Sequence, residues 1–310
     1  MISLIILTYN NFHVTSKPCL DSLRKVIDND FELIIVNNLS NDASRDLLSK
    51  YIDKTSLPNP LYPDKNLGYG GGMNLGCLQA KGDWLVLINS DTIFFNDSLK
   101  QLKTVLERTK NDIVGCLTNA AGTAQEIIKS EDSAFIAKTA EDIHKKPTQI
   151  EIPLIRADFF CCAIRKECWE SLNGFDEIYG LGYYEDIDFS ERAKRTGFKV
   201  GMTEDVFIAH IGGASFKGLS NDQKQLIKKN KAIFTKRFPD IQLLNTRDDN
   251  LEALNYYLRL LEHGKISEGM RHRLSLRLKR ADENIPRSFF KKRRYKKKLM
   301  QIKENLARYI

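Results

Sequence analysis

The sequence predicts an α/β fold in which a parallel sheet is covered by helices on both faces. Apolar, β-branched runs predict strands at 2–8, 32–36 and 84–89. Between them, leucine and isoleucine recur at helical spacing, and this alternation of strand and helix is typical of a parallel sheet. Ligands bind such sheets at the carboxyl ends of the strands, so function is sought there.

The elements follow in order along the chain. Helices are predicted at 14–27, from a cap at Ser40 or Asn41 to Ile52, and at 98–108. Proline and glycine break the stretch 59–74, which predicts a loop before a short helix that ends near Gly82. A strand is expected at 155–164, then a short helix ending near Gly174 and another helix beginning near Glu185.

Length and composition set the protein class. A chain of 310 residues can bury a full core, and it has no uncharged apolar run of the length that spans a membrane. The first residues lack the pattern of a signal peptide, so a cytoplasmic location is expected. The six cysteines show neither C-x-x-C pairs nor zinc spacing, and we expect them to be reduced core residues.

Charge divides the chain into two parts. Residues 217–310 carry 25 Lys and Arg against 10 Asp and Glu, whereas residues 1–216 carry 23 against 30. An acidic body does not suit a nucleic-acid binder, whose binding surface is basic. We therefore expect a domain at 1–216 and a basic helical extension at 217–310, with amphipathic helices marked by Leu251, Leu254, Leu258, Leu261, Leu299, Ile302 and Leu306.

Polar residues follow three of the predicted strands. Asn10, Asn37, Asn38 and the group 89–91 would converge on one crevice. The absence of a P-loop lysine motif and of G-x-G-x-x-G argues against an ATPase or a dinucleotide enzyme. The carboxylate of Asp91 suits Mg²⁺ or Mn²⁺, which could hold a diphosphate there. Asp91 could equally cap the turn before the next helix.

Seven motifs in order resemble those of family 2 glycosyltransferases, particularly bacterial rhamnosyltransferases and galactofuranosyltransferases of surface polysaccharide synthesis. They are LTYNN at 7–11, VNNLSNDAS at 36–44, NLGYGGGMNLG at 66–76, NSD at 89–91, GFDE at 174–177, YYEDIDFSERAKRTGF at 183–198 and IAHIGGAS at 208–215. This resemblance implies a GT-A fold. It also implies inverting sugar transfer from a nucleotide-diphosphate sugar to a hydroxyl of a glycan or lipid-linked acceptor.

The resemblance also implies residue roles. Asp186 would be the general base and Glu185 would position the acceptor, while Asp91 and His210 would bind Mn²⁺ or Mg²⁺. The donor and nucleotide would contact Thr8, Asn10, Asn37, Asn38, Asp42, Asn66, Gly71, Gly72, Asn74, Asn89 and Ser90, and the acceptor Arg156, Asp158, Trp169 and Tyr184.

The chain departs from the family pattern at two positions. Asn89 replaces the first acidic residue of the metal motif. Asn37 replaces an aspartate that contacts uracil in many relatives, so thymidine and guanosine donors stay open.

Simpler interpretations exist for several of these residues. Acidic residues at 185–188 complement a helix N-terminus in many proteins, and an isolated histidine such as His210 is often structural. A binding module that keeps the fold without catalysis is the alternative function. A nucleotidyltransferase would bring a glycine-rich basic loop after the first strand, where this chain has YNNFHVTSK.

The segment 287–300, RSFFKKRRYKKKLM, mixes Phe289, Phe290 and Tyr295 with many basic residues. This pattern favours contact of 287–310 with an anionic membrane surface, on the inner face of the cell membrane. The alternatives are a solvated basic helix and contact with nucleic acid. Of these partners we expect the membrane and not nucleic acid.

Overall fold

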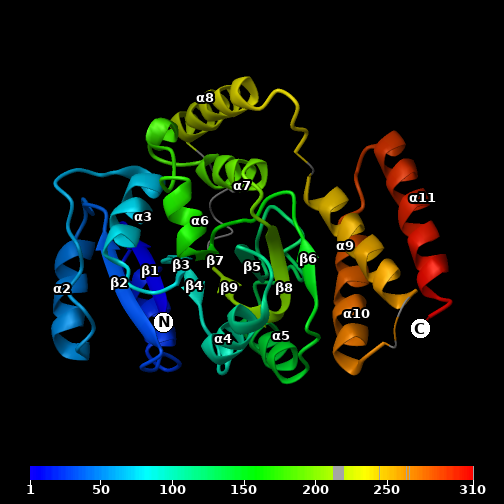
Figure 1. Ribbon diagram of the computed structural model, residues 1–310, viewed down its shortest axis with the longest axis horizontal. Coiled ribbons are helices and arrows are strands. Elements are labelled where there is room, and N and C mark those ends of the chain that lie inside the picture. The colour runs from blue at the N-terminus through cyan, green and yellow to red at the C-terminus, as the bar shows by residue number, and fades with distance from the viewer. Residues whose placement is uncertain (212–219, 244, 263, 265, 310) are drawn as a thin grey trace.

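The computed structural model describes residues 1–211, 220–243, 245–262, 264 and 266–309. Helices flank a seven-stranded sheet, and three C-terminal helices lie beside one of its edges (Figure 1). The strands are β1 (Ile2–Thr8), β2 (Phe31–Asn37), β3 (Trp84–Asn89), β4 (Thr92–Ile93), β5 (Ile113–Leu117), β6 (Glu151–Pro153), β7 (Cys161–Arg165), β8 (Val200–Phe207) and β9 (Ala209–His210).

The helices of the first part of the chain are α1 (Ser16–Leu23), α2 (Ser44–Thr55), α3 (Gly68–Gln79), α4 (Ser98–Arg108), α5 (Ser133–Lys145), α6 (Lys166–Ser171) and α7 (Glu185–Arg195), with a 3₁₀ turn, η1 (Glu177–Tyr179). They are followed by α8 (Asn221–Arg237), α9 (Thr246–Leu261), α10 (Glu268–Glu283) and α11 (Phe289–Leu306).

The large sheet is mixed, not wholly parallel. Its order is β2-β1-β3-β7-β5-β8-β6, with β1 parallel to both β2 and β3 and β5 parallel to β8. β7 runs antiparallel to β3 and β5, and β6 runs antiparallel to β8. The prediction of a parallel sheet is therefore wrong for β6 and β7. Continuous apolar runs report burial on both faces and carry no information about strand direction.

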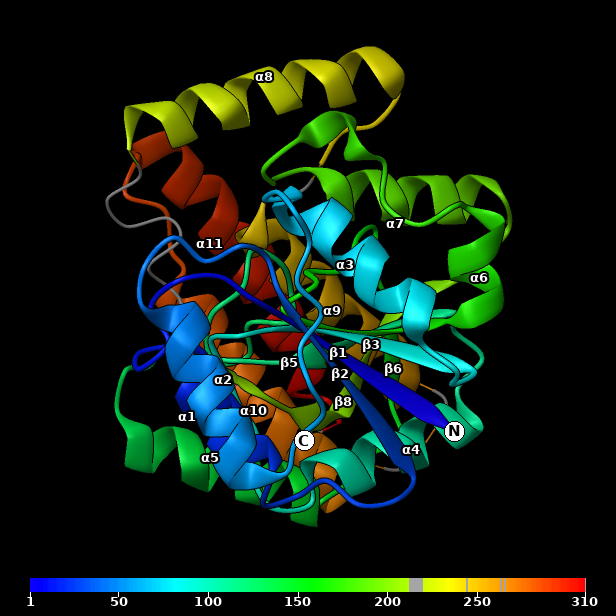
Figure 2. The ribbon, with the colours of Figure 1, turned by 90° about the vertical axis from the view of Figure 1, so that its left-hand side faces the viewer.

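The two faces of the sheet carry separate hydrophobic clusters. Leu4 and Ile6 of β1 pack in a cluster with α1, α2 and α4, whereas Ile5 packs in a cluster with α3, α6 and α7. Successive residues of a strand point to opposite faces, which explains this division. Figure 2 shows α3, α6 and α7 on one side of the strands, with α2 and α4 on the other.

The glycine-rich stretch forms most of helix α3, so the predicted loop is wrong there. A Cβ on Gly72 would lie 2.5 Å from Cδ1 of Leu7, and one on Gly76 would lie 2.4 Å from Cγ2 of Ile5. Glycine therefore allows α3 to pack closely on β1.

Three other element boundaries can be compared with their predictions. The strand expected at 155–164 begins only at Cys161, and α2 begins at Ser44 with Ala43 at its N-cap instead of Ser40 or Asn41. The helix near Glu185 begins where it was predicted.

Two expectations drawn from composition are confirmed within the described residues. All six cysteines are buried and none forms a disulfide, as expected for core residues. None of the helices in the described part of the chain is both long enough and apolar enough to cross a bilayer.

Helices α9, α10 and α11 share one hydrophobic cluster with β8 and α5. The predicted apolar faces are confirmed, because all seven leucine and isoleucine positions marked in α9 and α11 belong to this cluster. The C-terminal helices thus pack directly on the part of the chain that forms the sheet. The predicted boundary after residue 216 falls in 212–219, outside the described residues.

Three arginines on one face of α10 are buried against the edge of the sheet beside which the C-terminal helices lie. Arg277 forms an ion pair with Glu204 of β8, and both side chains are fully buried. Arg280 pairs with Glu126, and Arg273 donates to the carbonyl oxygens of residues 143, 146 and 204. Part of the basic charge of the C-terminal region is therefore structural and unavailable to any partner.

We expect Arg277→Ala to lower the free energy of unfolding by about 3–5 kcal/mol, because Glu204 would keep its charge without its partner. Urea denaturation followed by circular dichroism measures this loss. The pair Arg277→Met with Glu204→Gln should recover most of it. The matched control is Lys303→Ala, which removes an exposed pair with Asp282 and should cost less than about 1 kcal/mol. Equal losses in Arg277→Ala and Lys303→Ala would contradict the prediction.

Candidate active site

The carboxyl ends of β1, β2 and β3 lie at one edge of the sheet. Register pairs Thr8 with Asn37 and Leu7 with Asn89. The amide nitrogen of Asn37 donates to Oγ1 of Thr8 at 3.2 Å and to Oγ of Ser40 at 3.1 Å, while its oxygen accepts from the backbone of Ser40. Thr8 and Asn37 are each 1% exposed. Both side chains therefore have a structural role at the edge of the site, and neither offers a free hydrogen-bonding group to a ligand.

Asn38 and Asn66 form a second internal link. The amide nitrogen of Asn38 donates to Oδ1 of Asn66 at 3.0 Å and to the carbonyl oxygen of Gly68 at 2.9 Å. The oxygen of Asn38 accepts from the backbone of Leu67. These bonds join the end of β2 to the start of α3, so Asn38 also has a structural role.

Asn10 and Asp42 tie the loop after β1 to the loop after β2. Asn10 exchanges hydrogen bonds with Asn41, and Asp42 accepts from the backbone of Asn11 at 3.0 Å. Hydrogen bonding, chiefly from Ser44, holds the pKa of Asp42 below its ordinary value. This carboxylate stays ionised and exposed beside the strand ends.

Asp91 and His210 meet at the same edge, although 119 positions separate them in the chain. Strand β4, which follows Asp91, pairs with β9, which contains His210. Nε2 of His210 lies 3.1 Å from Oδ1 of Asp91. Burial lowers the pKa of His210, but the adjacent carboxylate of Asp91 more than compensates, so the net pKa is raised.

The ring of His210 is held so that Nε2 faces the carboxylate. Nδ1 lies 2.9 Å from the carbonyl oxygen of Ala120, which can only accept, so the neutral ring carries its proton on Nδ1. Phe160 stacks on the ring with centroids 5.3 Å apart. Asn119 exchanges hydrogen bonds with the backbone of His210. No local pattern marks Asn119 or Phe160, because both lie in loops that are distant from His210 in the chain.

The carboxylate of Asp91 and the imidazole of His210 are ligands that suit a divalent cation. Nε2 of His210 is buried and, apart from the carboxylate of Asp91, has no partner within the described residues, while Oδ1 of Asn89 is buried and makes no hydrogen bond there. A neutral imidazole nitrogen beside a carboxylate is a common pair of metal ligands. No group of three or more His, Cys, Asp or Glu able to hold a metal occurs in the described residues. Other ligands would have to come from a bound diphosphate or water.

Two carboxyl groups open helix α7. Burial, and next the charge of Asp186, raise the pKa of Glu185 to about 8. Burial and the charge of Asp158 raise the pKa of Asp186 to about 6, against the opposing effect of Arg156. Near neutral pH the pair therefore holds one proton on Glu185 and one negative charge on Asp186. Oε2 of Glu185 is buried and makes no hydrogen bond among the described residues.

The two halves of the site are close enough to interact. The charge of Asp158 raises the pKa of both His210 and Asp186, so Asp158 lies near the cation pair and near the carboxyl pair. Arg156 forms an ion pair with Asp158 at 3.0 Å. Burial raises the pKa of Tyr184, which lies just before α7. The charge of Arg156 lowers this pKa and that of Asp186 raises it. Three of the four acceptor-side candidates thus gather near Asp186.

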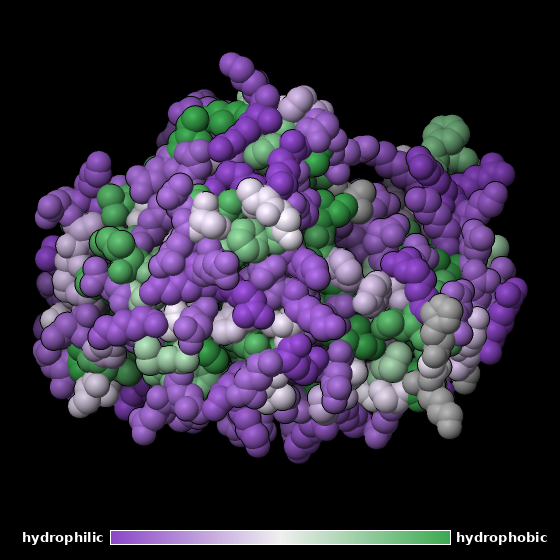
Figure 3. All heavy atoms as spheres, viewed as in Figure 1, coloured by the Kyte–Doolittle hydropathy of each residue, from purple (hydrophilic) through white to green (hydrophobic). Residues whose placement is uncertain are grey.

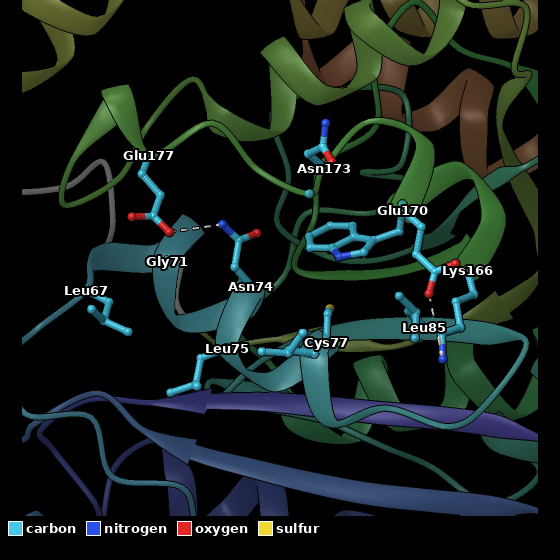
Figure 4. Close-up of a pocket in the computed structure, with 13 residues that line it drawn as sticks. Leu67, Gly71, Asn74, Leu75, Cys77, Leu85, Lys166, Glu170, Asn173 and Glu177 are labelled. Carbon is cyan, nitrogen blue, oxygen red and sulfur yellow. Dashed lines mark hydrogen bonds and ion pairs between the residues drawn. The ribbon is translucent and has the colours of Figure 1, made fainter.

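Trp169 is not brought to this crevice. It is 6% exposed and packs in the core against Phe175 and Phe189, with ring centroids 5.0 and 5.1 Å apart. Its edge, together with Gly71 and Asn74, lines a separate pocket of about 590 Å³ beside α3 and α6 (Figure 4). Asn74 donates there to the carbonyl oxygen of Phe175 and to Glu177.

Asp91, Asp186 and His210 do not line this pocket. In the structure Trp169 packs in the core and Asn74 links α3 to the segment 175–177, while contact of Gly71 and Asn74 with the donor stays a prediction. Gly72 packs on Leu7 of β1. Ser90 and Asn89, by contrast, stay at the carboxyl edge beside Asp91, half-buried.

Comparison with known proteins identifies the family of this chain. The family model "Glycosyl transferase family 2" matches residues 3–170. The chain is 33% identical over 146 residues to the putative glycosyltransferase EpsH of Bacillus subtilis, a match covering 47% of this chain and 40% of the relative. It is 24% identical over 247 residues to a poly(ribitol-phosphate) beta-glucosyltransferase of Bacillus spizizenii, covering 73% and 37%. The chain thus spans about two fifths of the length of these relatives.

Solved structures share the fold at low sequence identity. Staphylococcus aureus TarS 1–349 in complex with UDP-GlcNAc superposes with a TM-score of 0.52 and 16% identity, covering 92% of this chain and 82% of that chain. The mannosyltransferase PcManGT of Pyrobaculum calidifontis, in complex with GDP-Man and Mn²⁺, gives 0.51 and 14%, covering 99% and 74%. These neighbours establish the GT-A fold. With the family model matching more than half of its length, the chain belongs to glycosyl transferase family 2.

Proposed function

We propose that the protein is an inverting glycosyltransferase that moves a sugar from a nucleoside-diphosphate sugar to a hydroxyl of a surface glycan or glycolipid. The observation that carries this proposal is the meeting of Asp91 with His210 at the carboxyl edge of the sheet, with Asp158 close enough to act on both His210 and Asp186. Relatives named as glycosyltransferases, and neighbours bound to UDP-GlcNAc and GDP-Man, support a nucleotide-sugar donor.

The carboxyl pair suits a single displacement. Inversion needs one base that takes the proton of the attacking hydroxyl, and Asp186 is the carboxylate that is charged near neutral pH. A pKa raised toward the working pH makes it a stronger base than an ordinary aspartate. Glu185 keeps its proton in this range and can donate it to an acceptor oxygen.

The other side of the crevice would bind the diphosphate. Asp91 and His210 would hold Mn²⁺ or Mg²⁺, and such an ion supplies positive charge opposite the leaving diphosphate. Asn89 and Ser90, which precede Asp91, would contact the nucleotide, and Oδ1 of Asn89 makes no hydrogen bond within the described residues. The motif set resembles that of rhamnosyltransferases, so a rhamnosyl donor is included among the donors to be tested.

We expect one nucleoside diphosphate among UDP, dTDP, GDP, CDP and ADP to raise the melting temperature only when Mn²⁺ is present, because a ligand that binds the folded state stabilises it. His210→Ala should raise the Mn²⁺ concentration for half-maximal stabilisation by about tenfold or more, and Asp91→Ala should abolish the effect.

The control for this experiment is His144→Ala. His144 is buried and both of its ring nitrogens have backbone partners, so its loss should leave the Mn²⁺ requirement unchanged. An unchanged requirement in His210→Ala would remove His210 from the cation site. No response to any diphosphate would favour a binding module without this donor chemistry.

Asp186→Asn should lower kcat by roughly 10²–10⁴-fold with the diphosphate response intact, because the amide cannot accept the hydroxyl proton. In the unmodified protein kcat/KM should fall as the pH drops through about 6, where Asp186 becomes protonated. An ordinary aspartate would place that limb near pH 4. The residual activity of Asp186→Asn should lack this limb, and near-normal turnover in this variant would refute the assignment.

We also propose that the start of α11 contacts an anionic membrane surface, where a lipid-linked acceptor would lie. Phe289 and Phe290 are 72% and 82% exposed, and the basic residues at 291–294 and 296–298 are exposed as well. Figure 3 shows apolar atoms beside strongly hydrophilic ones at the end of the molecule where α11 begins. Tyr295 does not contribute, since it is buried and donates to the carbonyl oxygen of Ala281.

Charge reversal is the appropriate test, because deleting α11 would uncover Leu299, Ile302 and Leu306. The double change Lys291→Glu and Lys292→Glu should weaken binding to phosphatidylglycerol vesicles by at least about tenfold, whereas phosphatidylcholine vesicles should bind poorly in every case. Lys100→Glu with Lys110→Glu changes the net charge equally at exposed sites elsewhere and is the control. Equal losses in both pairs would exclude a specific membrane-binding face.

A further inference from the structure

The backbone just before Glu185 adopts an uncommon conformation. Tyr183 and Tyr184 have φ angles of +70° and +81°, a region that non-glycine residues rarely occupy, and Gly180 and Gly182 also have positive φ. Such a turn persists only where neighbouring groups hold it. Its conformation sets the direction in which α7 begins, and therefore where Asp186 lies.

The group that holds this turn comes from helix α8. Asn230 is fully buried, and its amide nitrogen donates to the carbonyl oxygens of Tyr179 at 2.8 Å, Gly182 at 2.8 Å and Tyr183 at 3.0 Å. Carbonyl oxygens only accept, so the nitrogen and not the oxygen of Asn230 must face them. One side chain thus fixes three points of the turn.

The same face of α8 holds the helix beyond the turn. Nη1 of Arg237 lies 3.0 Å from Oδ2 of Asp188, two residues after Asp186, and 2.7 Å from Asp176. Phe234 lies between Asn230 and Arg237 on α8, and its ring packs on Tyr184 with centroids 5.7 Å apart. Figures 1 and 2 both show α8 next to α7, above it in each view. This contact therefore holds the chain on both sides of the two carboxyl groups.

We propose that Asn230 is a positioning residue for Asp186, acting through the turn 179–184. The proposal rests on the proposed role of Asp186 as general base. A base must lie within hydrogen-bond reach of the attacking hydroxyl, and a displacement of about 1 Å can lower the rate by about 10²-fold. Asn230 lies outside the stretch that matches the family model, so the match assigns it no role.

The test is a double-mutant cycle between Asn230→Ser and Asp186→Asn. Turnover is followed as the nucleoside diphosphate released when the sugar of UDP-glucose, GDP-mannose or dTDP-rhamnose passes to water as the acceptor. The donor used is the one whose nucleoside diphosphate stabilises the protein with Mn²⁺. Asn230→Ser should lower kcat by about 10- to 100-fold in the native background and by less than twofold in the Asp186→Asn background. The Mn²⁺-dependent diphosphate response should not change, because Asp91 and His210 come from other elements.

Two further variants separate positioning from general loss of stability. Leu254→Ala removes a fully buried side chain of α9, lowers stability, and should keep normal kcat below its unfolding temperature. Arg237→Gln alters a side chain that is 39% exposed, so this variant should fold even if Asn230→Ser does not. It should also lower kcat in the native background and leave kcat nearly unchanged in the Asp186→Asn background.

Each outcome decides the proposal. An equal loss of kcat from Asn230→Ser in both backgrounds, or a loss matched by Leu254→Ala, would overturn it while leaving the role of Asp186 intact. A normal kcat in Asn230→Ser and in Arg237→Gln would also overturn it. Near-normal turnover of Asp186→Asn itself would instead remove the proposed base, and the positioning role would fall with it.

Discussion

Close packing of α3 on β1 is the constraint on which the site depends. Gly72 and Gly76 place the helix so near the strand that a single added carbon would meet the side chains of Leu7 and Ile5. The start of α3 also touches the turn before α7, since a Cβ on Gly68 would lie 2.1 Å from the carbonyl oxygen of Gly180. One helix therefore sets the distance between the strand ends and the carboxyl pair of α7.

Some polar side chains at the site make all their hydrogen bonds within the protein, whereas others keep atoms available for a ligand. Thr8, Asn37 and Asn38 use their hydrogen-bonding groups within the protein. By contrast, Asn89 Oδ1 and Glu185 Oε2 are buried and make no hydrogen bond within the described residues, and His210 Nε2 has only the carboxylate of Asp91 beside it. An unpaired buried polar atom is costly, and its concentration at one edge is typical of a site that binds a polar ligand.

The C-terminal helices have two electrostatic roles. Arg273, Arg277 and Arg280 are buried in hydrogen bonds and ion pairs with the sheet edge and its loops, whereas the basic residues at the start of α11 are exposed. Helix α8 adds a third kind of contact, since Asn230 and Arg237 reach the turn and helix that carry Asp186. A total charge per segment cannot distinguish these roles, because it counts buried and exposed groups alike.

The sequence alone determined the first three strands, the start of α7 and the order of the motifs, because apolar periodicity and strand-end polar residues are local signals. It also marked Asp91, His210, Glu185 and Asp186 through the family resemblance. Only the tertiary structure decided the reversed direction of β7, the helical state of the glycine-rich stretch and the core position of Trp169. These depend on contacts between residues far apart in the chain. The same holds for Asn230, whose role is visible only once α8 lies against the turn before α7.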